Sequence, residues 1–481
     1  VYIYYIYKNV HVDNGIINTE NMDTNDSVYV NWDENESISL KELLTYALTK
    51  NWIDMDKLTA EKYSSLQEAY DSLLEYISNY ISNDTGFGKK VYRYMISSGS
   101  ISGWEVCMML YEQGVLEPSG SAYEGLSSGR MSAYDFMINA ITEKTITPAQ
   151  LALEPCSGSA VVADPDTGEL LALVSYPGYD NNRLSGTVDK DYYEQLRNDK
   201  AKPLINKATS LRTAPGSIFK PCSAITGLEQ GVISTGESIV CTGQYTAVTP
   251  SPKCWIYPRS HGAENVSTAI RDSCNVFFYT VGHRLGMESG GTYNSTKGTD
   301  LLKNYAEQLG LATKSGVEIY EMDPHPSDRD AVASAIGQGT HAYSAINLCR
   351  YVSTLATSGV CHDFTLVSKI TDYNGNVIRD NEPVVSNTMN VSSSTWNAVH
   401  QGMRLVIENT ASFKGLPYQA AGKSGTAQEN TNKADHITFI SYAPYDNPEV
   451  AVSVLIPNGY ASSNAAKLTS DIYKIYWGLD K

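Results

Sequence analysis

The stretch Pro215-Gly216-Ser217-Ile218-Phe219-Lys220-Pro221 places a serine three residues before a lysine. Apolar residues at helical spacing follow Ser217 as far as about Gln230, and Gly231 is a plausible stop. We therefore expect Ser217 and Lys220 on one face of a helix, near its start. A lysine kept neutral by burial can take the proton of a serine nucleophile. Such a pair also arises by chance about once or twice in a chain of this length, as a capping serine and a solvated lysine.

Two later motifs turn this pair into a set. Ser273-Cys274-Asn275 precedes an apolar helical run, and Lys423-Ser424-Gly425-Thr426 lies at an apparent strand start. In this order and spacing, the three motifs form the acyl-serine set of penicillin-binding proteins and serine β-lactamases. The set predicts acyl transfer through Ser217.

Further segments resemble the penicillin-binding transpeptidase family. Residues 160–182 contain the turn Asp164-Pro165-Asp166-Thr167-Gly168 and resemble the opening of that domain, and Ala335-Ile336-Gly337-Gln338-Gly339 resembles another family loop. The resemblance covers roughly residues 150–481 and is to class B-like, monofunctional members. It implies an α+β fold, an antiparallel sheet flanked by helices, and a peptidoglycan D,D-transpeptidase that cross-links D-Ala-D-Ala stem peptides and is acylated by β-lactams.

The resemblance also implies roles for single residues. Ser217 attacks the penultimate D-alanine carbonyl, Lys220 accepts its proton, Ser273 relays a proton to the leaving amine and Asn275 holds the substrate amide. Lys423 supports the electrostatics, while Ser424, Gly425 and Thr426 form the substrate-binding strand. The backbone N–H groups of Ser217 and Thr426 resemble an oxyanion hole.

Residue patterns predict the same kind of domain. Apolar runs at 160–164 and 170–176, joined by a Pro-Asp-x-Gly turn, predict a β-hairpin. Segments 436–442 and 449–456 predict a second pair of strands, and 465–477 predicts a closing helix. We expect one sheet completed by both ends of a domain spanning residues 151–481.

Residues 1–150 contain no recognisable chemistry. They are rich in Asn, Asp, Ser and Tyr, and apolar residues at three- and four-residue steps predict helices at Leu40–Leu48 and Leu66–Ile81. We expect a mainly helical, non-catalytic, pedestal-like module without glycosyltransferase features.

Charge and hydropathy limit the partners. The 481 residues carry a formal net charge of −17, which argues against nucleic acid. No run of about eighteen apolar residues occurs, so nothing in the chain is expected to span a bilayer. The family implies the extracytoplasmic face of the membrane, an N-terminal anchor absent from this chain, a lipid-linked glycan precursor as substrate and a membrane-bound glycan polymerase as partner.

A group of possible metal ligands needs a separate explanation: Cys241, Cys254, His261 and Cys274 lie between or within the first two motifs. Three thiolates and an imidazole suit tetrahedral Zn²⁺, with Asp272 as a fallback ligand, and some clostridial-type family members resemble this chain in carrying zinc near the active site. The alternatives are free buried thiols or a Cys241–Cys254 disulfide. No organic cofactor is expected. The other cysteines (Cys107, Cys156, Cys222, Cys349 and Cys361) are expected to pack in cores.

Other functions use the same residues. A D,D-carboxypeptidase differs only in using water as the acceptor. A serine β-lactamase is disfavoured by the chain's size and by the lack of a recognisable Glu-x-x-Leu-Asn element. A penicillin sensor or scaffold with an inert fold is the non-enzymatic alternative, which the complete motifs disfavour.

Overall fold

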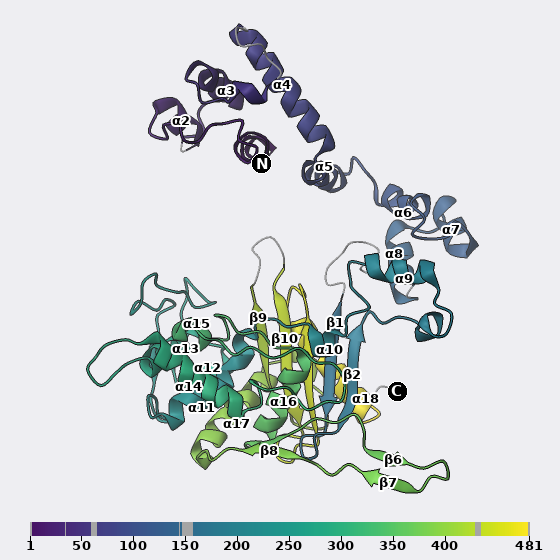
Figure 1. The fold of residues 1–481 in the computed structure, drawn as a ribbon, viewed down its shortest axis with the longest axis vertical. Coiled ribbons are helices and arrows are strands. Elements are labelled where there is room, and N and C mark those ends of the chain that lie inside the picture. Colours follow the sequence, from purple (N-terminus) through teal and green to yellow (C-terminus); the bar gives the residue numbers. More distant parts are fainter. Residues whose placement is uncertain are drawn as a thin grey trace. The chain divides into compact units, whose positions relative to one another are not determined.

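The structure, a computed structural model, describes residues 2–33, 35–58, 65–143, 145–146, 157–428 and 434–479. The chain divides into two units, residues 1–146 and 147–481 (Figure 1). The expected boundary at residues 150 and 151 falls outside the described residues.

The first unit is helical. Both predicted helices form, as α3 (Leu40–Thr49) and α4 (Leu66–Asn83). Each begins with a capping box, in which a serine and the glutamate three residues later satisfy each other's backbone N–H groups. The remaining elements are α1 (Tyr2–Tyr5), the π-helix η1 (Ile6–Val12), α2 (Ser27–Asp33), η2 (Met55–Lys57), α5 (Thr85–Ser97), α6 (Gly103–Glu112), α7 (Gly120–Ser127) and α8 (Ala133–Thr142).

The second unit is built on an antiparallel sheet, as the α+β prediction requires. The order of its strands is β2-β1-β11-β10-β9, so strands from both ends of the domain meet at its centre. The predicted hairpin and the predicted C-terminal strand pair both form. The strands are β1 (Gly158–Ala163), β2 (Leu170–Tyr176), β9 (Ala421–Ala427), β10 (His436–Ala443) and β11 (Val450–Ile456).

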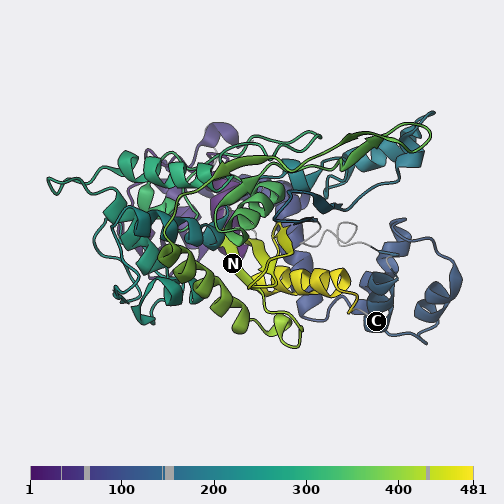
Figure 2. The ribbon, with the colours of Figure 1, turned by 90° about the horizontal axis from the view of Figure 1, so that it is seen from below.

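Helices cover both faces of this sheet. In β11, Ala451 and Leu455 pack into the core shared with α16 (Ala345–Ala356), while Val450, Val452 and Val454 pack into the core shared with α18 (Ser462–Tyr476). Figure 2 shows α18, in yellow, beside the strands. The regular alternation in the sequence therefore marks two apolar faces rather than one apolar and one wet face.

A layer of helices lies against β9 and forms the rest of the larger core. Helix α17 (Ser393–Glu408) contacts both β9 and α12 (Val266–Arg271), and α11 (Lys220–Glu229) packs on α13 (Asn275–Leu285). The other helical elements of this unit are η3 (Asn181–Leu184), α9 (Lys190–Asn198), α10 (Lys207–Ser210), η4 (Gly216–Phe219), α14 (Ser295–Gln308), α15 (Ala331–Ser334) and η5 (Ala411–Phe413). Three two-stranded ribbons complete the unit: β3 (Ile239–Cys241) with β4 (Gly262–Glu264), β5 (Val360–His362) with β8 (Val385–Thr388), and β6 (Lys369–Thr371) with β7 (Val377–Asp380).

The described cysteines outside the 241–274 segment are buried free thiols: Cys107, Cys222, Cys349 and Cys361. Burial raises the pKa of the Cys222 and Cys349 thiols, which keeps them protonated and suited to an apolar core. Cys156 lies outside the described residues. Among the described helices, none combines the length and the apolar character needed to cross a bilayer.

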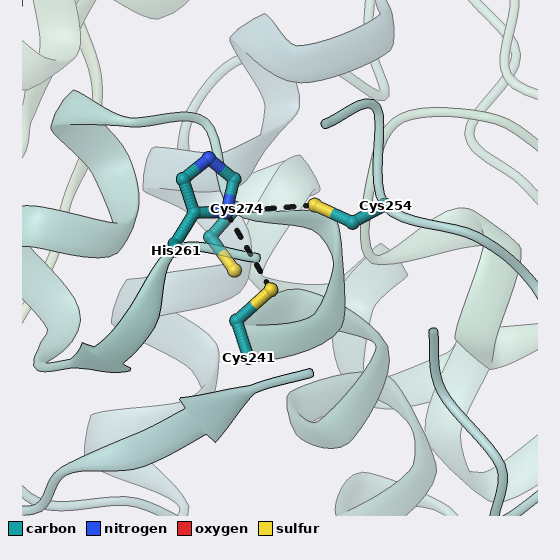
Figure 3. Close-up of side chains that lie close together, drawn as sticks. All are labelled: Cys241, Cys254, His261 and Cys274. Atoms are coloured by element: carbon teal, nitrogen blue, oxygen red, sulfur yellow. Dashed lines mark hydrogen bonds between the residues drawn. The ribbon is translucent and has the colours of Figure 1, made fainter. Parts of the chain in front are cut away.

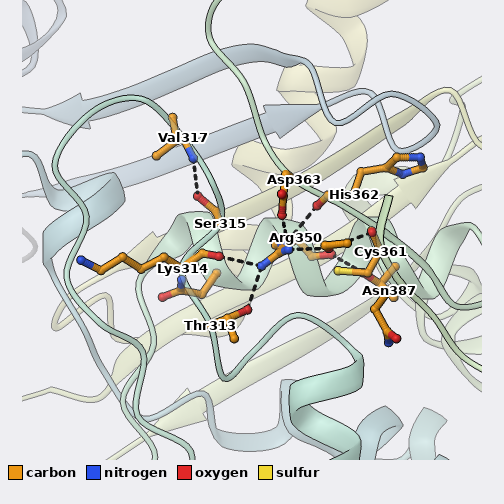
Figure 4. A network of polar contacts seen from close by, with 12 residues as sticks. Thr313, Lys314, Ser315, Val317, Arg350, Cys361, His362, Asp363 and Asn387 are labelled. Atoms are coloured by element: carbon orange, nitrogen blue, oxygen red, sulfur yellow. Dashed lines mark hydrogen bonds and ion pairs between the residues drawn. The ribbon is translucent and has the colours of Figure 1, made fainter. Parts of the chain in front are cut away.

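Arg350 fastens helix α16 to the segments around it (Figure 4). Its side chain is only 3% exposed. The guanidinium donates to the carbonyl oxygens of His362 and Lys314 and to the hydroxyl of Thr313, at 2.9, 2.7 and 3.1 Å. It also pairs with the Asp363 carboxylate at 2.7 Å. One buried cation thus satisfies acceptors from two segments that lie far apart in the sequence.

Replacing this cation should destabilise the domain. We expect Arg350→Met to lower the free energy of unfolding by about 3 kcal/mol, because several buried acceptors lose their donor at once. Arg197→Met is the matched control, since Arg197 is exposed and pairs only loosely with Glu194; its effect should stay under about 0.5 kcal/mol. Denaturant unfolding of the full chain measures both, and equal effects of the two variants would refute the role of Arg350.

Candidate active site

Ser217 lies in a tight turn that opens helix α11. The predicted single helix starts instead as the 3₁₀ turn η4, in which the Lys220 N–H donates to the Ser217 carbonyl. Pro221 has no N–H with which to bind that carbonyl, so the i→i+4 bond of an α-helix is unavailable at this point. In this turn Ser217 is partly exposed, whereas Lys220 is fully buried.

The backbone before Ser217 is packed against two other segments. Gly216 has a φ of +56°, and its N–H donates to the Gly337 carbonyl at 3.0 Å. A Cβ on Gly216 would lie 2.3 Å from the Thr426 carbonyl oxygen, and a Cβ on Gly337 would lie 1.9 Å from the Gly216 carbonyl oxygen. A Cβ on Gly425 would meet the Pro215 carbonyl at 2.5 Å. These glycines allow the nucleophile turn, the 335–339 loop and strand β9 to touch.

Two buried lysines converge on Ser273. The Lys220 Nζ donates to the Ser273 carbonyl at 2.7 Å, to the Ser273 Oγ at 3.1 Å and to the Asn275 Oδ1 at 2.7 Å. The Lys423 Nζ donates to the same Ser273 Oγ at 3.2 Å and to the Ser424 carbonyl at 3.0 Å. The structure therefore brings residues of all three sequence motifs into a single hydrogen-bonded group.

Burial changes the chemistry of these amines. Desolvation, only partly offset by the nearby thiols of Cys274 and Cys254, lowers the pKa of Lys220 to about 7. The pKa of Lys423 also lies well below its ordinary value, because that amine is buried and faces Lys220. At neutral pH a substantial fraction of Lys220 is neutral and able to accept a proton from the adjacent serine.

Ser273 is held in a conformation that serines rarely adopt. Its φ is +53°, in the left-handed region. Hydrogen bonds from the Ser273 N–H to the Ile270 carbonyl and from the Cys274 N–H to the Ala269 carbonyl fix this turn at the end of α12. Backbone strain of this kind persists only where the surroundings enforce it, and it aims the hydroxyl between the two lysines.

These groups lie at the base of a cleft of about 720 Å³. Along β9 the side chains alternate: Lys423 is buried on one face, while Ser424 and Thr426 line the cleft on the other. Ser217, Ser273 and Asn275 line it as well. All the predicted catalytic and substrate-binding residues are therefore gathered around one opening, and Gly425 supports it through close packing.

Some residues that line the cleft were not predicted from the sequence. Trp255 stands at its wall, 61% exposed, with its Nε1 donating to the Asp272 carbonyl at 3.0 Å. Polar side chains outside the three sequence motifs also line it: Arg271, Asn409, Gln428, Asp435 and Ser462. None of these belongs to a motif with a fixed spacing, so only the fold could reveal them.

The predicted cysteine and histidine ligands also come together (Figure 3). The ligand atoms of Cys241, Cys254, His261 and Cys274 all lie within 4.8 Å of one another. The His261 Nδ1 is 3.5 Å from the Cys241 Sγ and 3.6 Å from the Cys254 Sγ. In a tetrahedral zinc site with bonds of about 2.0 to 2.3 Å, ligand atoms lie about 3.5 to 3.8 Å apart. The donor set and its spacing therefore fit zinc.

This cluster of three cysteines and one histidine touches the catalytic motif. Cys274 is the middle residue of Ser273–Asn275, and the Cys254 Sγ accepts a hydrogen bond from the Asn275 N–H at 3.3 Å. Contact between the thiols lowers the pKa of Cys254 and raises that of Cys274. All three thiols are free, so the alternative Cys241–Cys254 disulfide is not formed.

The fallback ligand, Asp272, has a different partner. Its carboxylate pairs with the Arg271 guanidinium through contacts of 2.8 and 2.6 Å, and it is not among the clustered ligand atoms found in the described residues. Arg271 is the last residue of α12 and Asp272 is its C-cap, and at this helix end their side chains pair. The sequence order alone does not predict this ion pair.

Comparison with known proteins identifies the family. A family model described as the penicillin binding protein transpeptidase domain matches residues 158–474. The chain belongs to this family. It is 29% identical over 362 residues to the peptidoglycan D,D-transpeptidase MrdA of Haemophilus influenzae, covering 67% of this chain and 53% of that protein. It is also 29% identical over 332 residues to the peptidoglycan D,D-transpeptidase PbpA of Mycolicibacterium smegmatis, covering 63% and 62%. The chain spans about half the length of the MrdA relatives it matches.

Solved structures of family members share the fold. Pseudomonas aeruginosa PBP2 in complex with WCK 5153 matches with a TM-score of 0.58 and 26% identity, over 66% of this chain and 70% of that one. A structure described as the structural coordination of polymerization and crosslinking by a peptidoglycan synthase complex matches with a TM-score of 0.60 and 26% identity, over 68% and 56%.

Proposed function

We propose that this chain is a peptidoglycan D,D-transpeptidase of the monofunctional type. The observation that carries the proposal is the position of the Ser273 hydroxyl between the amines of Lys220 and Lys423, beside Ser217 in an open cleft. That arrangement supplies a nucleophile, a base and a proton relay in one place. The substrate is the D-Ala-D-Ala end of a stem peptide, presented on a lipid-linked glycan.

The first half of the reaction forms an acyl-enzyme. Neutral Lys220 takes the proton of Ser217, whose Oγ attacks the penultimate D-alanine carbonyl. Ser273 passes a proton to the leaving nitrogen, and the terminal D-alanine departs as a free amine. Asn275 holds the substrate amide, and the hydroxyls of Ser424 and Thr426 bind its terminal carboxylate. The N–H groups of Ser217 and Thr426 stabilise the oxyanion, and removing one such donor costs about 3 kcal/mol.

The second half releases the acyl group. An amine of a neighbouring stem peptide attacks the ester, the bond from the carbonyl carbon to the Ser217 Oγ breaks, and the amine proton returns to that oxygen. β-Lactams imitate the dipeptide and stop at the acyl stage. A D,D-carboxypeptidase would use water at this point.

A β-lactamase would need a carboxylate base placed to activate water beside the nucleophile. Two aspartates are among the described residues that line the cleft. Asp272 is already paired with Arg271. Asp435 directly precedes His436, which pairs with Ala427 at the end of β9 that follows the substrate-binding residues. The pairing of Asp272 with Arg271 disfavours that aspartate as the base.

We further propose that the helical unit, residues 1–146, is a non-catalytic pedestal and that the enzyme works at the extracytoplasmic face of a membrane. An anchoring helix upstream of this chain and a membrane-bound glycan polymerase as partner complete the proposal. The support for the partner is the likeness to the peptidoglycan synthase complex, which is described as coordinating polymerization and crosslinking.

We also propose that Cys241, Cys254, His261 and Cys274 hold a structural Zn²⁺. Bound there, the ion would join β3, the Cys254 loop, the start of β4 and the start of α13 by four ligands. The His261 Nδ1 faces two of the thiols. The ion would thereby hold the segment that carries Ser273 and Asn275.

Covalent labelling tests the nucleophile. We expect fluorescent penicillin to label the full chain at one site, and Ser217→Ala to abolish the label because it removes the attacking hydroxyl. Ser463→Ala, a substitution of an exposed serine on α18, serves as the control and should label like the wild type. Mass spectrometry locates the adduct. An adduct that survives Ser217→Ala contradicts the enzyme, the absence of any adduct supports an inert sensor or scaffold, and an adduct hydrolysed within seconds supports a β-lactamase.

The pH dependence of acylation tests Lys220. Because the folded-state pKa of this lysine is lowered to about 7, its neutral form increases as the pH rises through that value. The second-order rate of penicillin acylation should therefore climb between about pH 5.5 and 7 by about tenfold per unit at the acidic end, and level off above about pH 8. Stopped-flow or quenched labelling measures it, and a flat profile over this range would exclude Lys220 as the base.

Elemental analysis tests the metal. Protein purified without added metal should contain about one zinc per chain, and His261→Ala or Cys241→Ser should lower this content severalfold. Cys107→Ser is the control, because Cys107 is a buried thiol of the other unit. A wild-type content far below one zinc per chain, measured with no metal chelator in any buffer, would contradict the proposal.

A further inference from the structure

A second hollow, of about 600 Å³, adjoins the catalytic cleft. Ile336 and Gln338 line both spaces. Gly337, which lies between them in the chain, packs directly on Gly216, the residue before the nucleophile. The two hollows therefore meet at the loop that supports Ser217, and a molecule in the second one can extend towards the acyl group.

The walls of the second hollow are held by specific contacts. Tyr279 on α13 donates to the Lys253 carbonyl at 3.4 Å, which ties one wall to the loop opposite. The Ala331 N–H donates to the Ser295 Oγ at 3.0 Å, which joins the starts of α15 and α14. Helices α13, α14 and α15 contact one another and lie together in Figure 1. The hollow is therefore a formed feature of the fold.

One charge faces this hollow. Of the described residues that line it, only Asp330 has a carboxylate or another formally charged side chain. Asp330 is exposed and has a φ of +56°. One carboxylate oxygen accepts the Ala333 N–H at 3.0 Å, capping α15, and the other oxygen is left to meet a ligand. Most of the remaining lining is apolar, as in a site for the aliphatic part of a peptide.

We propose that this second hollow binds the acceptor stem peptide, with Asp330 attracting its ammonium group. The inference rests on the proposed transpeptidase function, which needs two peptides at one serine. The donor occupies the cleft walled by β9, so the acceptor needs a separate approach that ends at the same carbonyl. A carboxylate in a mostly apolar hollow complements a peptide whose reacting end is a protonated amine.

The chemical step that follows is balanced by the two substrates. The ammonium first loses a proton to water, and the neutral nitrogen attacks the acyl carbonyl. A carbon–nitrogen bond forms, the ester bond to the Ser217 Oγ breaks, and the second proton of the nitrogen passes to that oxygen. Asp330 takes no part in this exchange. It is a positioning residue that raises the local concentration of the acceptor.

Partitioning of the acyl-enzyme tests the proposal. The full chain is acylated with a thioester analogue of the donor, and the products of aminolysis and hydrolysis are measured as a free-amine acceptor peptide is added. We expect Asp330→Asn, which retains an oxygen for the α15 cap, to raise the acceptor concentration for half-maximal aminolysis about tenfold, equivalent to about 1.4 kcal/mol. Penicillin acylation should be unchanged. Asp328→Asn is the control, since Asp328 is exposed and does not line the hollow.

Two further readouts separate a binding role from a structural one. Added salt should raise the acceptor concentration that the wild type needs for half-maximal aminolysis, because it screens the charge of Asp330. The same concentration should change little for Asp330→Asn. Thr249 is exposed and lines the same hollow. Thr249→Lys should also raise the acceptor concentration for half-maximal aminolysis, because it adds a positive charge there, and it leaves the Asp330 cap of α15 in place. If both variants are acylated normally, and need the same acceptor concentration and respond to salt in the same way as the wild type, the acceptor site is refuted while the proposed function stands. A wild type that is not acylated by donor or penicillin would instead overturn the proposed function.

Discussion

A buried amine holds the catalytic motifs of this domain together. The Nζ of Lys220 has three acceptors within hydrogen-bonding distance, all from the short segment Ser273–Asn275. Taking a charged amine out of water costs several kcal/mol unless it is bonded or neutralised, and both conditions are met here. Lys423 approaches the same hydroxyl from the sheet. The Ser273 hydroxyl is therefore a point at which the helical layer and the sheet meet, through one amine from each.

The proposed chemistry could be read from the sequence because it demands fixed residue types in a fixed order. Ser217, Lys220, Ser273, Asn275 and Lys423 were recognisable as motifs, and the structure gathers them in one cleft. The α+β fold was predictable for a related reason. Alternating apolar residues and turn signals identify strands locally, and the family resemblance supplies their arrangement.

The rest depends on contacts that sequence patterns do not encode. The left-handed φ of Ser273 is imposed by the turn after α12, and serine itself gives no sign of it. Trp255 and Asp330 reach their hollows through loops whose course is set by distant packing. The possible metal ligands show the same limit: the sequence allowed Asp272 as a fallback ligand, but its carboxylate pairs with Arg271.

The strand order determines the stage of synthesis at which the central sheet can form. β11 lies between β1 and β10, so the middle of the sheet needs a strand from the far end of the domain. Until that segment has been synthesised, the first hairpin has no central partner, and β9 lacks the sheet that carries Lys423 to the nucleophile. Pairings between residues so far apart in sequence form late. A growing chain therefore carries Ser217 before the strands that bring Lys423 to Ser273 exist, so the arrangement around the serine forms only once the sheet has closed.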